Sequence, residues 1–326
     1  MSELRSVEWT GAAIRLIDQT ALPGTLAYAE VRTVDELVSA IQRLVVRGAP
    51  AIAVAGAYGV ELARRAGGDV DAAVARIRGA RPTAVNLAVA VDEVAAAEDA
   101  LLAAKAVEQA EVDANLAMGR FGADWLVARL GERPLRLLTH CNTGTFATPG
   151  QGTALGIIRE LHRRGLVERV HVDETRPLLQ GARLTAWELG YDGIPHVVQA
   201  DSVAAGEILR GQIDAAIVGA DRVAANGDVA NKIGTVGVAL ACGYAQVPFV
   251  VAAPTTTVDV TTASGADIHI EQRAGAEVVA FNGIASAPVD SVGYNPAFDV
   301  TPADLVTALV TERGVREVSA GQLPQG

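Results

Sequence analysis

Apolar residues recur at two different spacings along this 326-residue chain, and the spacing changes at "GERP" (131–134). Before this point, most apolar residues lie three or four positions apart, which is the period of an amphipathic helix. After it, short runs of Val, Ile and Leu alternate with helical segments, as in a parallel sheet covered by helices. The pattern therefore predicts a mainly helical domain over residues 1–130 and a doubly wound α/β domain over residues 131–326.

The helical half contains several start and turn signals. "AIRLIDQTALPG" alternates like a strand and ends in a Pro-Gly turn, so residues 1–25 are predicted to form a hairpin. Thr33 and Glu36 have the spacing of a capping box at the start of a helix. The next segment, "APAIAVAGAYGVELARRA", predicts a very apolar helix with Pro50 near its start. Ala-rich helical periodicity then continues over residues 68–130.

In the second half, polar side chains follow the predicted strands. Because ligands bind at the carboxyl ends of the strands in open parallel sheets, these side chains should share one edge and form the site. The thiol and the carboxylates at these ends are Cys141, Asp173, Glu174, Asp201 and Asp221. The five predicted strands cover residues 136–141, 168–174, 195–201, 214–221 and 248–254.

Cys141 ends the apolar run "LLTHC" and is followed by a glycine-rich loop. A lone cysteine near a strand end is often simple apolar packing, but a thiol beside helix N-terminal amides can have a depressed pKa. Spacing alone leaves both interpretations open. No cluster of Cys or His surrounds it in the sequence, so a metal site is not expected. Cys242 lies inside a helical run and is interpreted as packing.

The loop and the histidines near Cys141 suggest other roles. The glycines of Gly150–Gly156 do not have the dinucleotide-binding spacing, so we expect a backbone-amide cradle for an anion rather than a nicotinamide cofactor. If the strand stays extended, His140 should point away from Cys141, where it either supports the site residues from behind or packs in the core. The other histidines are interpreted as packing or surface residues: His162, His171, His196 and His269.

Asp221 follows the apolar run "AAIVGA". A carboxyl group there is partly desolvated, which raises its pKa and suits a general acid, although an ion pair with Arg222 is the alternative. In the predicted loop "VAANGDVANKIGT", Asn231 and Lys232 precede a helix. A helix N-terminus with one ammonium group predicts a phosphate site. Apart from Lys105, Lys232 is the only lysine in a chain that otherwise uses arginine.

Two segments of the helical half could complete an anion site. "RGAPAI" places Arg47 and the amides of Gly48 and Ala49 at the start of the apolar helix, and "RPTAVNL" places Arg81 before another. Either arginine could equally form an ordinary ion pair.

Charge and composition exclude several classes of protein. The formal net charge of −11 argues against a general binder of nucleic acid or of anionic membranes. Two cysteines provide no disulfide framework, and there is no long uncharged apolar run that predicts a membrane span. The N-terminus does not have the pattern of a signal or transit peptide, so a cytoplasmic location is expected.

Long collinear motifs resemble the methylthioribose-1-phosphate isomerase family of the methionine salvage pathway. They include "RGAPAIAVAGAYGV", "RPTAVNLAVAVDE", "LTHCNTGTFAT", "DETRPLLQGARLTAWEL", "IVGADRVAANGDVANKIGT" and "YNPAFDVTP", and the resemblance runs from about residue 15 to residue 313. The wider superfamily also includes ribose-1,5-bisphosphate isomerases and regulatory subunits of a translation-initiation exchange factor, which are not isomerases. The pairing of "THCN" with "GADR" matches the catalytic branch.

The resemblance implies a helical N-terminal domain on a Rossmann-like domain, a homodimer without a cofactor and a small phosphorylated pentose as substrate. It implies Cys141 and Asp221 as the catalytic pair. The implied substrate contacts are Arg47, Gly48, Ala49, Arg81, Gln180, Asn231 and Lys232. Phosphate on the anomeric oxygen blocks spontaneous ring opening, so Asp221 would protonate the ring oxygen. Cys141 would either take the C2 proton or steady a hydride shift.

Five residues depart from the family pattern. Phe146, Pro149 and Gln151 lie in the loop after Cys141, and Gln272 and Ala274 replace an acid and a proline. These positions leave open the substituent at the sugar 5-position, so 5-deoxyribose 1-phosphate and ribose 1,5-bisphosphate are alternative substrates. A non-catalytic regulatory homologue is the alternative from a different class.

Overall fold

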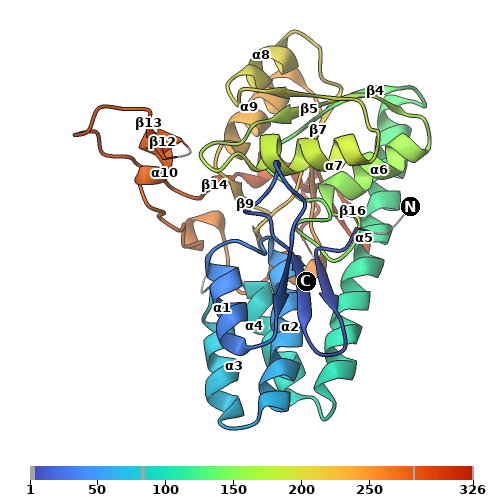
Figure 1. Ribbon diagram of the computed structural model, residues 1–326. Helices are drawn as coiled ribbons and strands as arrows, with labels where there is room; N and C mark the ends of the chain where they lie inside the picture. Colours follow the sequence, from blue (N-terminus) through green and yellow to red (C-terminus); the bar gives the residue numbers. More distant parts are fainter. Residues whose placement is uncertain (1–3, 82–84, 282, 325–326) are drawn as a thin grey trace.

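The computed structural model describes residues 4–81, 85–281 and 283–324, and the chain begins with a small antiparallel sheet beside a helical bundle (Figure 1). The predicted hairpin exists, but a third strand beyond residue 25 extends it. The strands are β1 (Val7–Trp9), β2 (Ile14–Ile17) and β3 (Tyr28–Val31), in the order β1-β2-β3. The capping box is confirmed: the Thr33 hydroxyl accepts from the Glu36 amide, and the Glu36 carboxylate accepts from the Thr33 amide.

Five helices follow this cap, and the second of them is the centre of the bundle. It spans the whole predicted apolar segment and is buried along most of its length, as expected for a helix that is apolar on all sides. The long Ala-rich run is interrupted because Asp99 caps a new helix. The last three residues of the "RPTA" motif, 82–84, lie outside the described residues. The helices are α1 (Val34–Gln42), α2 (Ala49–Ala66), α3 (Val70–Arg78), α4 (Val85–Ala96) and α5 (Ala100–Leu130).

The predicted parallel sheet is present and has two additional strands. All five predicted strands form, each within three residues of its predicted bounds. The sheet order is β16-β15-β10-β7-β4-β5-β6, parallel except for the edge strand β16. Its strands are β4 (Leu135–Thr139), β5 (Val167–Asp173), β6 (His196–Gln199), β7 (Ala215–Val218), β10 (Phe249–Ala252), β15 (Ala308–Thr311) and β16 (Gly314–Arg316).

Two strands of a second sheet occupy the segment that the sequence pattern predicts as a loop. The order β11-β8-β9-β14 places Lys232 on a strand, so its predicted loop position is wrong. The strands are β8 (Arg222–Ala224), β9 (Val229–Lys232), β11 (Val258–Asp259) and β14 (Phe298–Thr301). A two-stranded hairpin, β12 (Ala280–Phe281) and β13 (Ile284–Ala285), projects from the body of the molecule (Figure 1).

Short helices cover the sheet and connect its strands (Figure 1). The α-helices are α6 (Ala154–Arg163), α7 (Ala186–Tyr191), α8 (Val203–Leu209), α9 (Thr235–Ala245) and α10 (Ala276–Val279). A π-helix, η1 (Gly181–Thr185), precedes α7, and the 3₁₀ turns are η2 (Thr255–Thr257), η3 (Gly265–Asp267), η4 (Ala303–Leu305) and η5 (Val318–Ala320). None of the helices in the described part of the chain is both long and apolar enough to cross a bilayer.

Helix α5 belongs to both parts of the molecule. Its first turns, with Ala100 and Ala104, pack into the core formed around α2 and α4. Its second half, with Met118 and Leu126, packs into the core that lies under the parallel sheet. The helical pattern ends at Leu130, but the packing changes in the middle of the helix. The division of the chain at residue 131 remains a prediction about domains.

Candidate active site

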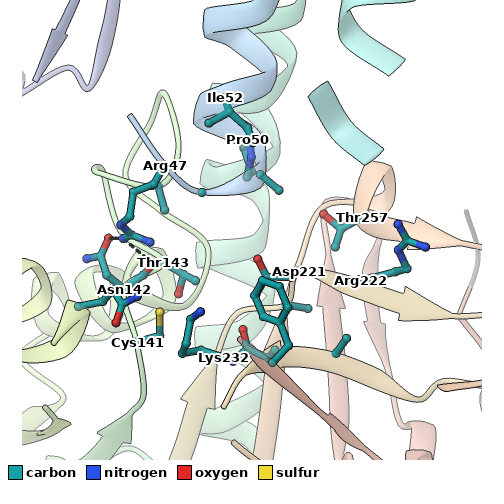
Figure 2. Close-up of a pocket in the computed structure, with 18 of the residues that line it drawn as sticks. Arg47, Pro50, Ile52, Cys141, Asn142, Thr143, Asp221, Arg222, Lys232 and Thr257 are labelled. Carbon is teal, nitrogen blue, oxygen red and sulfur yellow. Dashed lines mark hydrogen bonds between the residues drawn. The ribbon is translucent and has the colours of Figure 1, made fainter. Parts of the chain in front are cut away.

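A cavity of about 330 Å³ lies where the start of α2 faces the carboxyl ends of the strands (Figure 2). All nine predicted site residues line it, although they come from six separate stretches of the chain. The helical part supplies what we call the helical wall: Arg47, Gly48, Ala49 and Arg81. The α/β part supplies what we call the sheet wall: Cys141, Asp221, Asn231 and Lys232. Gln180 lies just before η1, beside both walls.

The helical wall is positioned by a close contact between two segments. Gly48 has a φ of +88°, and a β-carbon there would lie 2.6 Å from Ala147, in the loop that follows Cys141. Only glycine fits this approach, which brings the start of α2 against the end of β4. Arg47 extends the contact because its guanidinium group donates to the backbone carbonyl of Asn142 at 3.0 Å and also bonds the Asn142 side chain.

Cys141 is buried at the end of β4 and faces the cavity. Burial raises the pKa of the thiol, and the cations Arg47 and Lys232 act against this rise. The depressed pKa considered from the sequence is therefore wrong, because removal from water outweighs the favourable charges. Cys242 is buried in α9, as predicted, and its pKa is raised to about 12 by burial alone.

Asp221 follows β7 and lies on the far side of the Lys232 amine from Cys141 (Figure 2). Asp221 has an exposed surface, and this residue lines the cavity. The residues around the cavity still remove its carboxyl group from bulk water. This removal from water raises the pKa of the Asp221 carboxyl group, while Lys232 and Arg81 partly oppose the rise. The alternative ion pair with Arg222 does not form, since Arg222 lies 3.5 Å from the carboxylate of Asp259.

The cavity is locally cationic even though the chain is acidic. Three of its arginines have carboxylate partners: Arg81 with Glu271, Arg222 with Asp259, and Arg273 with Glu271 and Glu277. In the described part of the chain, Arg47 and Lys232 form no ion pair. Lys232 is buried, donates to the Ala297 carbonyl at 2.9 Å and lies 4.5 Å from the Phe298 ring centre. Burial lowers the pKa of Lys232.

The two helix N-termini near the cavity differ in what they can bind. The start of α2 has no side-chain cap. At the start of α9, the Asp299 carboxylate accepts from the amides of Gly234 at 2.7 Å and Val236 at 3.3 Å. The predicted phosphate site at the second of these helices is therefore wrong, because a carboxylate of the chain already occupies its amides. At the start of α2, Pro50 has no amide hydrogen and the Ala51 amide donates to the Ala147 carbonyl at 3.0 Å, so the amides of Gly48 and Ala49 are the ones that remain available at this terminus.

The glycine-rich loop after Cys141 does not form the predicted anion cradle. The amides of Gly150 and Gly152 both donate to the Thr148 hydroxyl, at 3.3 and 3.1 Å. Pro149 and Gln151 line a second cavity, of about 890 Å³, instead of the first.

The other departures from the family pattern also lie outside the site. Phe146 is fully buried in a small cluster with Ile17 and Leu184. Gln272 forms a backbone bridge to Pro296, and neither Gln272 nor Ala274 lines the cavity. The expectation that these departures bear directly on the sugar 5-position is therefore wrong.

Several polar atoms in the cavity have no hydrogen-bond partner in the described part of the chain, and three of them belong to threonines that were not predicted as site residues. Five of the ten buried side-chain atoms without a hydrogen-bond partner in the described residues belong to this cavity. Such atoms are rare in protein interiors and are expected where a polar ligand completes the bonding. They belong to Arg47, Thr143, Thr153, Gln180 and Thr257. His269, which was predicted as a packing or surface residue, also lines the cavity.

His140 points away from the cavity, as predicted, and belongs to a buried network. Its Nδ1 atom lies 3.0 Å from the Asp173 carboxylate, and its Nε2 atom lies 2.8 Å from the Ile233 carbonyl. With Asp201 these side chains have the spacing of a metal-ligand group. The Asp201 oxygens, however, already accept two backbone amides at 2.6 and 2.7 Å. The group is therefore satisfied as a hydrogen-bonded network.

A buried thiol, a desolvated carboxyl group and two cations that form no ion pair with the described residues surround one cavity and define a site for chemistry on a small anion. The model of the initiation factor 2 subunit family matches residues 45–318. Because this match spans most of the chain, the chain belongs to that family. The description of this family names initiation-factor subunits. Similar individual relatives distinguish a regulatory subunit from an isomerase.

Those relatives are named as isomerases. A methylthioribose-1-phosphate isomerase of Gloeobacter violaceus is 48% identical, covering 100% of this chain and 98% of the relative. A probable bifunctional methylthioribose-1-phosphate isomerase/methylthioribulose-1-phosphate dehydratase of Nocardia farcinica is 54% identical over 95% of this chain, which spans 58% of that protein. The crystal structure of 5-methylthioribose 1-phosphate isomerase from Pyrococcus horikoshii has a TM-score of 0.89 and 38% identity, covering 97% of this chain and 93% of that one. The chain is therefore an isomerase of this family, as its motifs predict.

Proposed function

We propose that the chain converts 5-methylthioribose 1-phosphate to 5-methylthioribulose 1-phosphate. The observation that carries this proposal is the arrangement of Cys141 and Asp221 on either side of Lys232 in one cavity (Figure 2). An aldose–ketose isomerase must donate a proton to one sugar atom while hydrogen leaves another, so it needs two groups on different sides of the sugar. A regulatory protein of the same fold would not need this pair.

The phosphate is held where positive charge is unpaired. At the N-terminus of α2, the amides of Gly48 and Ala49 and the helix dipole supply partial positive charge, and Arg47 stands immediately before them. Lys232 adds the second unpaired cation from the sheet wall. A phosphate fixed at one end orients the sugar between Cys141 and Asp221, which lowers the entropy cost of reaching the transition state.

Asp221 acts as the general acid. Its raised pKa keeps the carboxyl group protonated at a higher pH than an ordinary aspartate, so it can protonate the ring oxygen as the ring opens. Turnover should therefore fall as the pH rises through this raised pKa. The apolar walls of the cavity supply the desolvation that keeps the proton in place.

Cys141 has one of two roles, and an isotope experiment separates them. As a thiolate it would take the C2 proton and return it to C1 through an enediol, whereas as a neutral thiol it would only steady a hydride shift. Its raised pKa favours the neutral thiol. In D₂O the enediol route places deuterium at C1 of the product, and the hydride shift leaves C1 without deuterium. NMR of the product therefore assigns the role.

The cavity also favours an uncharged group at the sugar 5-position. Its apolar lining is formed by Leu44, Ile52, Leu178, Pro254, Ile268 and Phe298. A methylthio group fits such a lining, while a second phosphate would require further unpaired cations.

The deciding experiment compares kcat/KM for methylthioribose 1-phosphate, 5-deoxyribose 1-phosphate and ribose 1,5-bisphosphate. We expect the first to be highest and the bisphosphate lowest. A preference for one of the other two would replace the substrate but keep the reaction. Failure to isomerise any of the three would overturn the proposed function.

The assembly and location are further parts of the proposal. Exposed apolar side chains lie on the edge strand β6 and on the adjacent helices α8 and α9, which supports a homodimer through this face. They are Val197, Val198, Val203, Leu209, Leu240 and Tyr244. Light scattering coupled to gel filtration would test the dimer, and a monomer at micromolar concentration would contradict it. A cytoplasmic location and a place in methionine salvage remain predictions.

A further inference from the structure

Cys141 has a backbone conformation that residues with side chains rarely adopt. Its φ is +67°, in the left-handed region where the β-carbon crowds the following carbonyl group. Strain of this kind persists only where the surroundings hold it, and it is concentrated at functional sites. The groups that hold Cys141 are therefore part of the site even though they do not line the cavity.

Two buried threonine hydroxyl groups hold the peptide units on either side of Cys141. The Cys141 amide donates to Thr175 Oγ1 at 2.8 Å, and the Cys141 carbonyl accepts from Thr185 Oγ1 at 2.6 Å. Both threonines are fully buried. Thr175 lies two residues after β5 and Thr185 is the last residue of η1, and both are far from Cys141 in the sequence.

Thr175 is itself fixed in one orientation. Its hydroxyl donates to the Asp173 carbonyl at 2.9 Å, so its lone pair is directed toward the Cys141 amide. Its own amide donates to the Asp201 carboxylate at 2.6 Å, and its φ is also +67°. The contact with Cys141 therefore joins two left-handed residues, and neither can relax without breaking a buried hydrogen bond.

We propose that Thr175 is a positioning residue whose hydroxyl holds Cys141 in the left-handed conformation that directs its thiol toward the Arg47 and Lys232 cations. Relaxation of Cys141 to an ordinary conformation would turn the thiol away from these charges and from the bound sugar. The consequence for turnover rests on the proposed function, since it requires Cys141 to act in the isomerisation.

Two substitutions separate the effect of the Thr175 hydroxyl group from the effect of the shape of its side chain. Thr175→Val keeps the shape but removes the acceptor, and Thr175→Ser keeps the hydroxyl and removes a methyl group. We expect Thr175→Val to lower kcat on the order of 10²-fold, as a misplaced reacting group does. KM should change by less than about threefold because the phosphate contacts are untouched, and Thr175→Ser should stay within about threefold of the wild type in both constants.

A second measurement follows the reactivity of the Cys141 thiol in the absence of a sugar phosphate. The rate of Cys141 alkylation by iodoacetamide is measured against pH in a Cys242→Ala background, which leaves one thiol to react. Thr175→Val should move the midpoint to higher pH, and Thr175→Ser should not. A wild-type kcat and midpoint in Thr175→Val would overturn the proposal, as would equal damage by both substitutions.

A measurement on unsubstituted Thr175 covers the case in which Thr175→Val does not fold. Labelling with ¹⁵N-cysteine gives two amide signals, which the Cys242→Ala protein assigns. The Cys141 amide should exchange with D₂O as slowly as a buried helical amide, and exchange at the rate of an exposed amide would overturn the proposal. If the wild type isomerises none of the three sugars, the proposed function fails, while alkylation and exchange still decide the role of Thr175.

Discussion

The two walls of the cavity differ in the kind of group that each presents. The sheet wall holds the groups whose protonation state is shifted by burial, Cys141 and Asp221, together with one cation. The helical wall holds cations and open backbone amides, but no acid or thiol in its described residues. The difference suggests that the sheet wall performs the reaction and the helical wall binds the phosphate. Substitutions of the reacting groups in the sheet wall should therefore lower kcat, and substitutions in the helical wall should raise KM.

The largest effect is expected from the reacting groups of the sheet wall. Asp221→Asn and Cys141→Ala should each lower kcat on the order of 10²–10⁴-fold, because each removes a group acting on the transition state. Circular dichroism should show an unchanged fold. Cys242→Ala is the matched control, since it removes the other buried thiol and should keep wild-type kcat. Substantial turnover in either site variant would remove that residue from the mechanism.

A smaller and different effect is expected from the helical wall. Arg47→Ala should raise KM by about 10- to 100-fold, since hydrogen bonds to charged groups contribute about 1.5–3 kcal/mol. The exposed Arg43, four residues earlier, provides the control substitution Arg43→Ala. Steady-state kinetics decide the outcome: a loss confined to kcat would contradict the division between the walls.

Lys232 tests the functional division between the walls, because it is a cation that lies on the wall with the reacting groups. Lys232→Ala should weaken binding of the sugar phosphate by about 10-fold or more, as removal of one charge-assisted contact does. It should also raise the pKa of Cys141 further, because Lys232 favours the thiolate. Lys232→Arg keeps the charge and is the comparison variant. Calorimetry that finds unchanged affinity for the sugar phosphate would refute the phosphate role.

The smallest effect on turnover is expected from Glu111 of α5, which does not line the cavity. Burial raises the pKa of Glu111 to about 7, and its carboxylate accepts from the Thr256 hydroxyl at 3.4 Å, next to the cavity residue Thr257. Because the folded-state pKa lies above the unfolded value, ionisation costs stability. The free energy of unfolding should therefore fall as the pH rises from about 4.5 to about 7, by up to about 3 kcal/mol.

Glu111→Gln removes this titration. The variant should be more stable than the wild type at pH 8, by about 1–3 kcal/mol, and not more stable at pH 4. Urea unfolding at the two pH values measures the difference, with the exposed Asp113→Asn as control. Equal pH dependence in both proteins would contradict the assignment, and a large loss of kcat would place Glu111 in the reaction.

The sequence predicted the elements that depend on local pattern. The bounds of α2 follow from its continuous apolar character, and the five parallel strands follow from their short β-branched runs. The nine site residues all line one cavity, because motifs at the starts of helices and the ends of strands face the same edge of the sheet.

The errors have identifiable physical reasons. The β8–β9 hairpin contains Asn226-Gly227, a turn signal that could have placed Lys232 on a strand. The Asp299 carboxylate reaches α9 from another strand, so no local pattern indicates that the helix N-terminus is occupied. The direction of Phe146 and Gln151 depends on how the loop after Cys141 folds against α5 and η1, which spacing along the chain does not determine.

The shared helix α5 constrains how the molecule can be divided or synthesised. A fragment ending at Leu130 would expose to water the face of α5 that carries Met118 and Leu126, and a fragment beginning at Gly131 would lack the cover of its sheet. Neither piece could complete its interior alone. During synthesis, the second half of α5 therefore cannot bury its apolar face until the later strands have emerged.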